Sequence, residues 1–272
     1  IFSVMTSSSI EAAFVRFPIA LLIGGAAAAI IGVLVGIPVL RLRGDYLAIV
    51  TLAFGEIIKN IVNNLYLVKD SAGFHMEFDA AGKEIIINGA MGITGTPKDA
   101  GYIAGFILIF ITLIMILNLV RSRTGRAIMA IRDNRIAAES VGINVTKYKL
   151  IAFTVSAFFA GVAGALYSHN LSSLVATKFD YNYSIMILVF VVLGGIGSMR
   201  GSIIAAVILT ALPELLRGLS DYRMLIYAVI LIIMMLVNNN DKLSFYKEKL
   251  TEGFKAKAAG GTKREKREEG VS

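Results

Sequence analysis

Long apolar segments with few charges limit what this chain can fold into more than any other feature of its sequence. Hydrophobic residues make up 56% of its 272 residues, and charged residues only 17%. A helix of about 20 apolar residues crosses the hydrocarbon core of a bilayer. Inside lipid, backbone polar groups must be paired within the protein, and a helix pairs them within the segment. We therefore predict an all-α fold, a polytopic transmembrane helical bundle.

About seven spans are expected, one for each apolar run and two for the longest region. They are residues 18–40, 44–64, 102–120, 150–167, two spans within 184–216, and 224–237. Lys and Arg accumulate in short loops on the cytoplasmic side of membrane proteins. The basic loops of this chain all reach that side if the N-terminal end lies outside and the C-terminal tail inside.

The domain boundaries follow from these spans. Residues 1–17 are expected to form an external segment or linker, 18–237 the transmembrane domain, and 238–272 a charged, disordered cytoplasmic tail. The chain begins at Ile1 and not at Met, so we expect a preceding portion with further spanning helices. Residues 65–101 lack a basic bias and are predicted to be a polar external loop.

Small residues lie at helical spacing on one face of two predicted spans, which lets helices approach closely in a membrane. The first set is Gly24, Gly25, Ala28, Ala29, Gly32 and Gly36, and the second is Ser156, Ala157, Ala160, Gly161, Gly164 and Ala165. We expect these faces to serve helix packing.

The region 184–216 is interrupted by the sequence GGIGSMRG at 194–201. It forms either two spans joined by a tight cytoplasmic turn or a discontinuous helix that lines a cavity, where irregular backbone is tolerated. Arg200 favours the turn, because a basic residue there fits the cytoplasmic side.

A basic, amphipathic loop separates two spans. Residues 121–142 read RSRTGRAIMAIRDNRIAAESVG, with five arginines against one aspartate and one glutamate. Ile128, Ile131 and the pair Ala137–Ala138 form an apolar stripe at helical spacing, and Gly142 is suited to end a helix. The sequence predicts short surface helices that either offer a contact to a soluble partner or only fix topology at the headgroups.

Ionisable and glycine residues within the spans are candidates for a translocation path. Charged groups at membrane depth usually face a bundle interior or a water-filled cavity. The candidates are Asp45, Glu56, Asn60, Gly194, Gly195 and Gly197. Two alternative roles stay open: Glu56 pairs with Lys59 within the helix, and the remaining candidates only support packing.

Several functions are disfavoured by what the sequence contains. With no cysteine, thiolate metal sites and disulfides are excluded, and no metal site or cofactor is expected. His75 and His169 are predicted to lie in loops at the surface. The net charge of +8 reflects loops beside the membrane and the tail, so a nucleic-acid partner is not expected.

Three segments in order resemble the permeases of branched-chain amino acid ABC transporters, specifically the LivM type. They are RLRGDYLAIVTLAFGEII at 41–58, RTGRAIMAIRDNRIAAESVGINVTKYKLIAF at 123–153, and VVLGGIGSMRGSIIAAVILTALPELLR at 191–217. The sequence AAESVG is similar to the EAA loop of importer permeases: Ala137, Ala138 and Gly142 match, while Ile136 stands where that pattern has Glu. The segment 88–97 resembles the family's external loop only loosely.

The resemblance implies a permease subunit that imports leucine, isoleucine and valine across a bacterial-type cytoplasmic membrane. It implies a second permease subunit as a heterodimer partner, two cytosolic ATP-binding subunits and an extracytoplasmic substrate-binding protein. Loop 121–149 would couple to the ATPase through Arg126, Arg132, Asp133, Arg135, Ala137, Ala138, Glu139 and Gly142. The chain has no phosphate-binding loop of the form GxxxxGK[ST], so it is not expected to be an enzyme.

Three alternatives remain. First, the chain could be an importer permease for another solute, such as urea, an amide or a sugar. Second, it could be a secondary transporter, which would show internal repeats and charges at mid-membrane. Third, it could be a membrane-embedded enzyme, which would need a convergent set of catalytic residues. Copurification of an ATPase distinguishes an importer permease from the last two.

Overall fold

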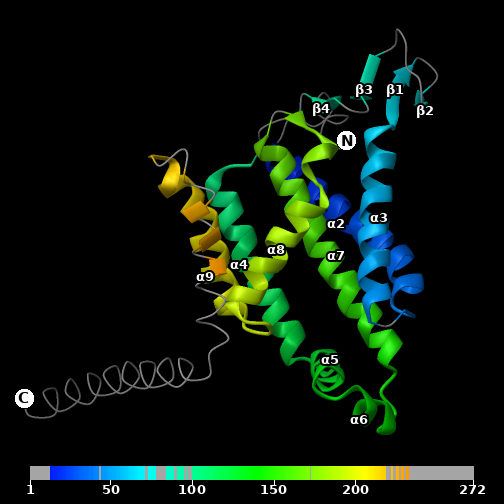
Figure 1. Cartoon of the computed structure of the whole chain (residues 1–272). Helices are drawn as coiled ribbons and strands as arrows, with labels where there is room; N and C mark the ends of the chain where they lie inside the picture. The colour runs from blue at the N-terminus through cyan, green and yellow to red at the C-terminus, as the bar shows by residue number, and fades with distance from the viewer. Residues whose placement is uncertain are drawn as a thin grey trace, which may run out of the picture. The chain divides into compact units, whose positions relative to one another are not determined.

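Most of the described residues are helical, and the chain divides into two compact units, Ile1–Tyr181 and Asn182–Ser272. The computed structural model describes residues 13–42, 44–70, 73–77, 84–88, 91–94, 96, 100–171, 173–218, 222, 225–226, 228–229 and 231–232 (Figure 1). The predicted N-terminal segment up to residue 12 and the charged tail lie outside the described residues.

Long helices of the first unit coincide with predicted spans. They are α2 (Ala13–Val39), α3 (Asp45–Asn63), α4 (Tyr102–Arg121) and α7 (Val145–Asn170). Helices α2 and α7 each begin five residues before the predicted start. Residues 145–149, which include Lys147 and Lys149, belong to α7 because the side chain of Asn144 caps the helix ahead of them: its Oδ1 accepts a hydrogen bond from Lys147 N at 3.0 Å.

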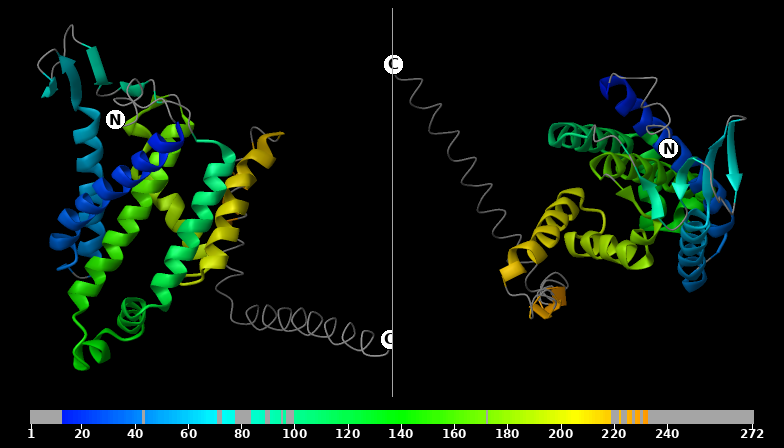
Figure 2. Two further views of the ribbon diagram at one scale, coloured as in Figure 1. Left: turned by 180° about the vertical axis from the view of Figure 1, so that it is seen from behind. Right: turned by 90° about the horizontal axis from the view of Figure 1, so that it is seen from above.

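Helices α2 and α7 pack face to face through their small residues; the use of each face for helix packing was predicted, but not that the two faces meet each other. A Cβ atom added at Gly161 would lie 2.4 Å from the Cβ of Ala28 and 2.6 Å from the carbonyl oxygen of Gly24. A Cβ at Gly32 would lie 2.6 Å from the Cβ of Ala157. Figure 2 shows α2 crossing α7 along much of its length. The close approach lets dispersion contacts hold the pair together where lipid supplies no hydrophobic drive.

A small antiparallel sheet lies mostly within residues 65–101, which we predicted to be a polar external loop, so this connection contains strands that the sequence reading did not identify. Its strands are β1 (Tyr66–Asp70), β2 (Gly73–Glu77), β3 (Glu84–Asn88), β4 (Gly92–Thr94) and β5 (Ser173–Leu174), in the order β2-β1-β3-β4-β5. Segments such as YLVKD and EIIIN are rich in β-branched and aromatic residues, which favour strands.

Glycine is required where β4 meets β5. Gly92 has a φ of +75°, and a Cβ there would lie within 1.9 Å of the carbonyl oxygen of Leu174. The hydroxyl of Thr96 donates a hydrogen bond of 2.6 Å to the carbonyl of Leu171. These contacts join the segment after α7 to the sheet.

His169 is buried and not a surface loop residue, so that prediction is wrong. It lies in the last turn of α7 and is 3% exposed. Its Nδ1 is 2.8 Å from the carbonyl oxygen of Ala165, and its ring meets Phe17 of α2 edge to face at 5.3 Å. The prediction failed because α7 extends past Tyr167 and its end packs against α2.

The sheet and the surface helices α5 (Arg123–Asp133) and α6 (Arg135–Ser140) lie at opposite ends of the long helices of the first unit (Figures 1 and 2). Helix α3 ends, α4 begins and α7 ends at the sheet. Helix α4 ends and α7 begins at α5 and α6. The long helices therefore alternate in direction, as spans of a polytopic protein must.

The second unit contains α8 (Tyr181–Gly194), α9 (Met199–Leu215) and a short 3-10 helix, η3 (Leu216–Gly218). The region 184–216 is thus two helices joined by a turn and not one broken helix. Gly195 and Gly197 have φ values of +95° and +90°, which favour glycine. Ser198 Oγ accepts a hydrogen bond from Gly201 N at 3.2 Å and so caps α9. From this turn α8 and α9 diverge (Figure 1).

Five helical segments among the described residues are long and apolar enough to cross a membrane, and they correspond to five of the predicted spans. Helix α9 has 17 residues and covers the sixth. The seventh, 224–237, falls mostly outside the described residues.

Candidate functional site

The candidate site is the bend between α4 and α7, residues 121–149, which we call the elbow. Its first junction is Ser122, which is both the C-cap of α4 and the N-cap of α5. Ser122 Oγ donates a hydrogen bond to the carbonyl of Leu119 at 2.6 Å and accepts one from Gly125 N at 3.1 Å. A Cβ at Gly125 would lie 2.2 Å from the carbonyl oxygen of Leu119. The junction between the two helices is therefore a single residue with tightly packed backbone.

A second junction joins α5 to α6 at Asn134. Its backbone N donates to the carbonyl of Ala130 at 3.0 Å, and its Oδ1 accepts from Ala137 N at 3.1 Å. Asparagine is a strong N-cap because its side chain satisfies a helix-start N–H that has no other partner. Again one residue bonds to both helices.

Gly142 ends α6, as its sequence position predicted. Its φ is +82°, its N–H donates to the carbonyl of Glu139, and the N–H of Ile143 donates to the carbonyl of Ala138, both at 3.0 Å. This pair of bonds is the Schellman motif, which requires a left-handed residue and so favours glycine.

The elbow has a hydrophobic core of its own. Ile131 of α5, Ala138 of α6 and Val145 of α7 are buried together, and Ile143 and Tyr148 pack against them. Ala138 is only 3% exposed, so a small residue is needed at this point of α6. This core packs α6 against the start of α7.

The outer surface of the elbow carries paired charges around an apolar projection. Arg135 Nε lies 3.0 Å from Glu139 Oε1, and Arg132 Nη2 lies 3.2 Å from Asp133 Oδ1. Ile136 is 79% exposed between these pairs and lines a shallow hollow with Asp133 and Glu139. A protruding apolar side chain with a charged rim has the character of a protein contact surface.

The predicted elbow residues occupy different positions in this arrangement. Ala137 is exposed and Ala138 is buried, while Arg126 donates a hydrogen bond of 2.9 Å to the carbonyl of Arg121. Sequence reasoning missed the capping roles of Ser122, Asn134 and Asn144. The available signal was a Ser or Asn placed three residues before the N–H that it bonds.

The residues predicted to line a translocation path do not form one cluster in the structure. Asp45 is the first residue of α3 and Glu56 lies eleven residues later, about 16 Å along the helix axis at 1.5 Å per residue. Asn60 is exposed on the same helix. Gly194, Gly195 and Gly197 shape the turn of the second unit.

Glu56 forms an ion pair with Lys59, three residues later, as one of the two interpretations predicted. The Lys59 side chain is 19% exposed and that of Glu56 46%. The neighbouring Asn63 Oδ1 is buried and accepts no hydrogen bond within the described part of the chain.

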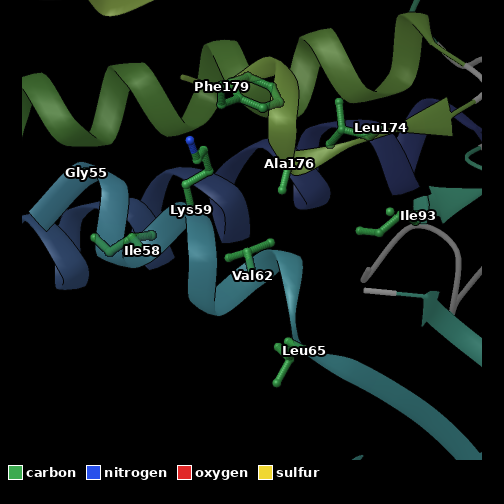
Figure 3. A pocket seen from close by; sticks show the side chains of 10 residues that line it. Gly55, Ile58, Lys59, Val62, Leu65, Ile93, Leu174, Ala176 and Phe179 are labelled. Atoms are coloured by element: carbon green, nitrogen blue, oxygen red, sulfur yellow. The ribbon is translucent and has the colours of Figure 1, made fainter. Parts of the chain in front are cut away.

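An apolar pocket that the sequence did not reveal lies beside this ion pair (Figure 3). It has a volume of about 350 Å³ and is formed by α3, β4, β5 and the 3-10 helix η2 (Ala176–Lys178). Its walls are apolar residues such as Val62, Ile93 and Phe179, and of the described lining residues only Lys59 carries a charged side chain. Among the described residues, no group of His, Asp or Glu is placed to hold a metal ion.

These features define the class of protein. Alternating helices, several of them long and apolar enough to cross a membrane, with a packed surface elbow at one end and a small sheet at the other, are the features of a multi-pass membrane protein. Residues 1–237 match the family described as the permease component of branched-chain amino acid transport systems, and the chain belongs to this family.

Curated relatives agree with the family. The chain is 37% identical, over 230 residues, to the high-affinity branched-chain amino acid transport system permease protein LivM of Salmonella typhimurium and to that of Escherichia coli. The matches cover 79% of this chain and 54% of each relative, so the chain spans about half the length of these relatives. The ribose import permease protein RbsC of Escherichia coli is 35% identical over 127 residues, covering 43% of this chain and 39% of that protein. No solved structure matches the chain.

Proposed function

We propose that the chain is a permease subunit of an ATP-driven importer for leucine, isoleucine and valine in a bacterial cytoplasmic membrane. It works with a second permease subunit, two cytosolic ATP-binding subunits and an extracytoplasmic substrate-binding protein. The family and the relatives' names support the transported class. The construction of the elbow supports the coupling to a cytosolic partner and is the observation on which the proposal rests.

The elbow suits this role because its interior is tightly packed and its outer surface is exposed. One residue bonds to both helices at each junction, Ser122 through its side chain and Asn134 through its backbone N–H and its side chain, and the shared core packs α6 against α7. Ile136 and its neighbouring charge pairs offer the contact surface. Docked in a groove of the ATPase, α6 would move when the nucleotide-bound subunits close. The long helices α4 and α7 would then tilt and alternate access to the path.

The path itself is proposed to run near Asp45, Glu56 and Asn60 of α3 and the turn at Gly194, Gly195 and Gly197. Glu56 is the strongest of these candidates, because it is half exposed beside the apolar pocket. Residues of this kind at membrane depth usually face a cavity.

Charge reversal in the elbow tests the coupling. In the assembled importer, we expect Arg132→Glu with Arg135→Glu to lower leucine uptake about tenfold, the effect of a loss of ~1.4 kcal/mol of docking free energy. The two exposed ion pairs contribute only about 0–1 kcal/mol each to folding, so the fold should persist. Uptake of leucine, isoleucine and valine into proteoliposomes and ATP hydrolysis are measured together.

The matched control is Arg123→Glu with Lys147→Glu, which also reverses two exposed elbow charges but leaves the surface around Ile136 unchanged. This control should retain uptake. Normal uptake by the Arg132/Arg135 variant would contradict the coupling role.

Import of a sugar is the second candidate, because RbsC shares 35% identity with part of this chain. Uptake of ribose in place of the three amino acids, by the same importer, would favour it.

A further inference from the structure

Among the described residues, the lining of the pocket beside α3 combines an apolar wall with the cationic side chain of Lys59. Figure 3 shows Lys59 reaching from α3 toward the side that carries Phe179, with Val62 and Ile93 on other walls. Its volume of about 350 Å³ falls in the range of small-molecule sites, about 300–1,000 Å³. The pocket therefore admits one small, mainly aliphatic molecule.

The charge at the pocket belongs to a pair of opposite charges. Lys59 lines the pocket and pairs with Glu56, which lies one turn earlier on α3 and is more exposed. An ion pair next to an apolar surface presents a cation and an anion that are only partly hydrated. Its best ligand carries both opposite charges close together beside an aliphatic group.

We propose that this pocket binds an aliphatic α-amino acid as its zwitterion. The Lys59 ammonium binds the α-carboxylate, the Glu56 carboxylate binds the α-ammonium, and the branched side chain lies against Val62, Ile93 and Phe179. The inference rests on the proposed function and adds the residues that recognise the solute. In the proposed topology the pocket lies at the outer end of α3, where a solute released by a binding protein would arrive.

A zwitterion is favoured because its two charges can replace the partners that Glu56 and Lys59 lose when their ion pair opens. Opening the Glu56–Lys59 pair leaves two charges without partners, which is costly beside apolar surface. A zwitterion restores one partner to each charge. A ligand with only one charge leaves the other side chain unpaired, and a sugar replaces neither charge.

Ligands that lack one charge test the assignment. The assembled importer in lipid nanodiscs, without its binding protein, is titrated with leucine, with isocaproate, which lacks the amino group, and with isopentylamine, which lacks the carboxylate. Leucine should bind about tenfold more tightly than either analogue, because a charge-assisted bond is lost in each.

Substitution of each charged residue should affect the binding of a different analogue. Lys59→Met should weaken leucine binding about tenfold and leave isopentylamine binding unchanged or stronger. Glu56→Gln should weaken leucine binding and spare isocaproate. A structural role for the pair would weaken all three ligands alike, and that result would overturn the proposal.

Filling the pocket gives an independent test. A Cβ at Gly55, which lines the pocket, would meet nothing within 4 Å, so Gly55→Leu should fold and block leucine binding. Gly164 of α7 is equally free around its Cβ and lies off the pocket lining, so Gly164→Leu is the matched control and should bind leucine normally. Normal binding by Gly55→Leu would overturn the site.

The same preparation separates the two proposals. If the wild-type importer takes up leucine with its binding protein present but the variants at Lys59 and Gly55 do so equally well, the pocket assignment fails and the proposed function stands. If the wild-type importer takes up none of the three amino acids, the proposed function is wrong, and so is the assignment of the pocket as an amino acid site.

Discussion

Two glycines of the elbow are needed for different physical reasons. Gly142 supplies the left-handed backbone that closes α6, and its position after a helical pattern predicted this from the sequence. Gly125 is needed because the carbonyls of Leu119 and Val120 approach it. That contact arises only once α4 and α5 meet at Ser122, so no local pattern revealed it.

We expect Gly125→Ala to destabilise the protein by about 1–3 kcal/mol, the usual cost of forcing an extra methyl group into a packed site. The new Cβ would lie 2.2 Å and 2.3 Å from the carbonyl oxygens of Leu119 and Val120, which belong to backbone and move with difficulty. Thermal unfolding in detergent measures the effect. Gly105→Ala, where a Cβ meets nothing within 4 Å, is the control, and equal unfolding temperatures for the two variants would refute the crowding.

At the scale of helices and strands, the sequence predicted the elements better than their partners. The small residues of α2 and α7 marked two packing faces, and the structure pairs them with each other. Nothing in either stripe specified that choice, because small residues fit any helix that approaches closely. Strand β5 was beyond sequence reasoning for a related reason: it is only two residues long and pairs with a strand about 80 positions earlier. Strands β1 and β3 carried a local signal in their β-branched and aromatic residues, which the sequence reading did not use.

The α2–α7 contact can be tested by crosslinking, because the chain contains no cysteine. A Cβ at Gly24 would lie 3.1 Å from the Cβ of Ala165, near the separation of about 3.5–4.5 Å found in disulfides. Gly24→Cys with Ala165→Cys should therefore form a disulfide on mild oxidation, detected by its changed mobility on gels. Gly24→Cys with Ala163→Cys, on the exposed side of α7, should not. Equal crosslinking of both pairs would contradict the packing.

For the whole molecule, hydrophobicity predicted the spans and their alternation because each helix must satisfy its own backbone in lipid. The pocket beside Lys59 was beyond such reasoning. Its walls come from α3, β4, β5 and η2, which the chain brings together only after the sheet forms. The elbow was predicted as a surface feature, but its core required Ile131, Ala138 and Val145 to meet in space.

Membrane topology can be checked with the same cysteine-free background. Ile136→Cys in the elbow and Met91→Cys beside the sheet both replace exposed residues. In intact cells, a maleimide that cannot cross membranes should label Met91→Cys and leave Ile136→Cys unlabelled until the cells are opened. Labelling of Ile136→Cys from outside would reverse the orientation and remove the basis for coupling to a cytosolic ATPase.

The one-residue junctions of the elbow have a mechanical consequence. Ser122 and Asn134 each bond to the helix before them and to the helix after them, so the chain has no slack at either point. No flexible linker between the helices would absorb a force applied to α6. In the proposed coupling, a force that the ATPase applies to α6 would therefore rotate the long helices, and a few flexible residues inserted at either junction would allow ATP hydrolysis without transport.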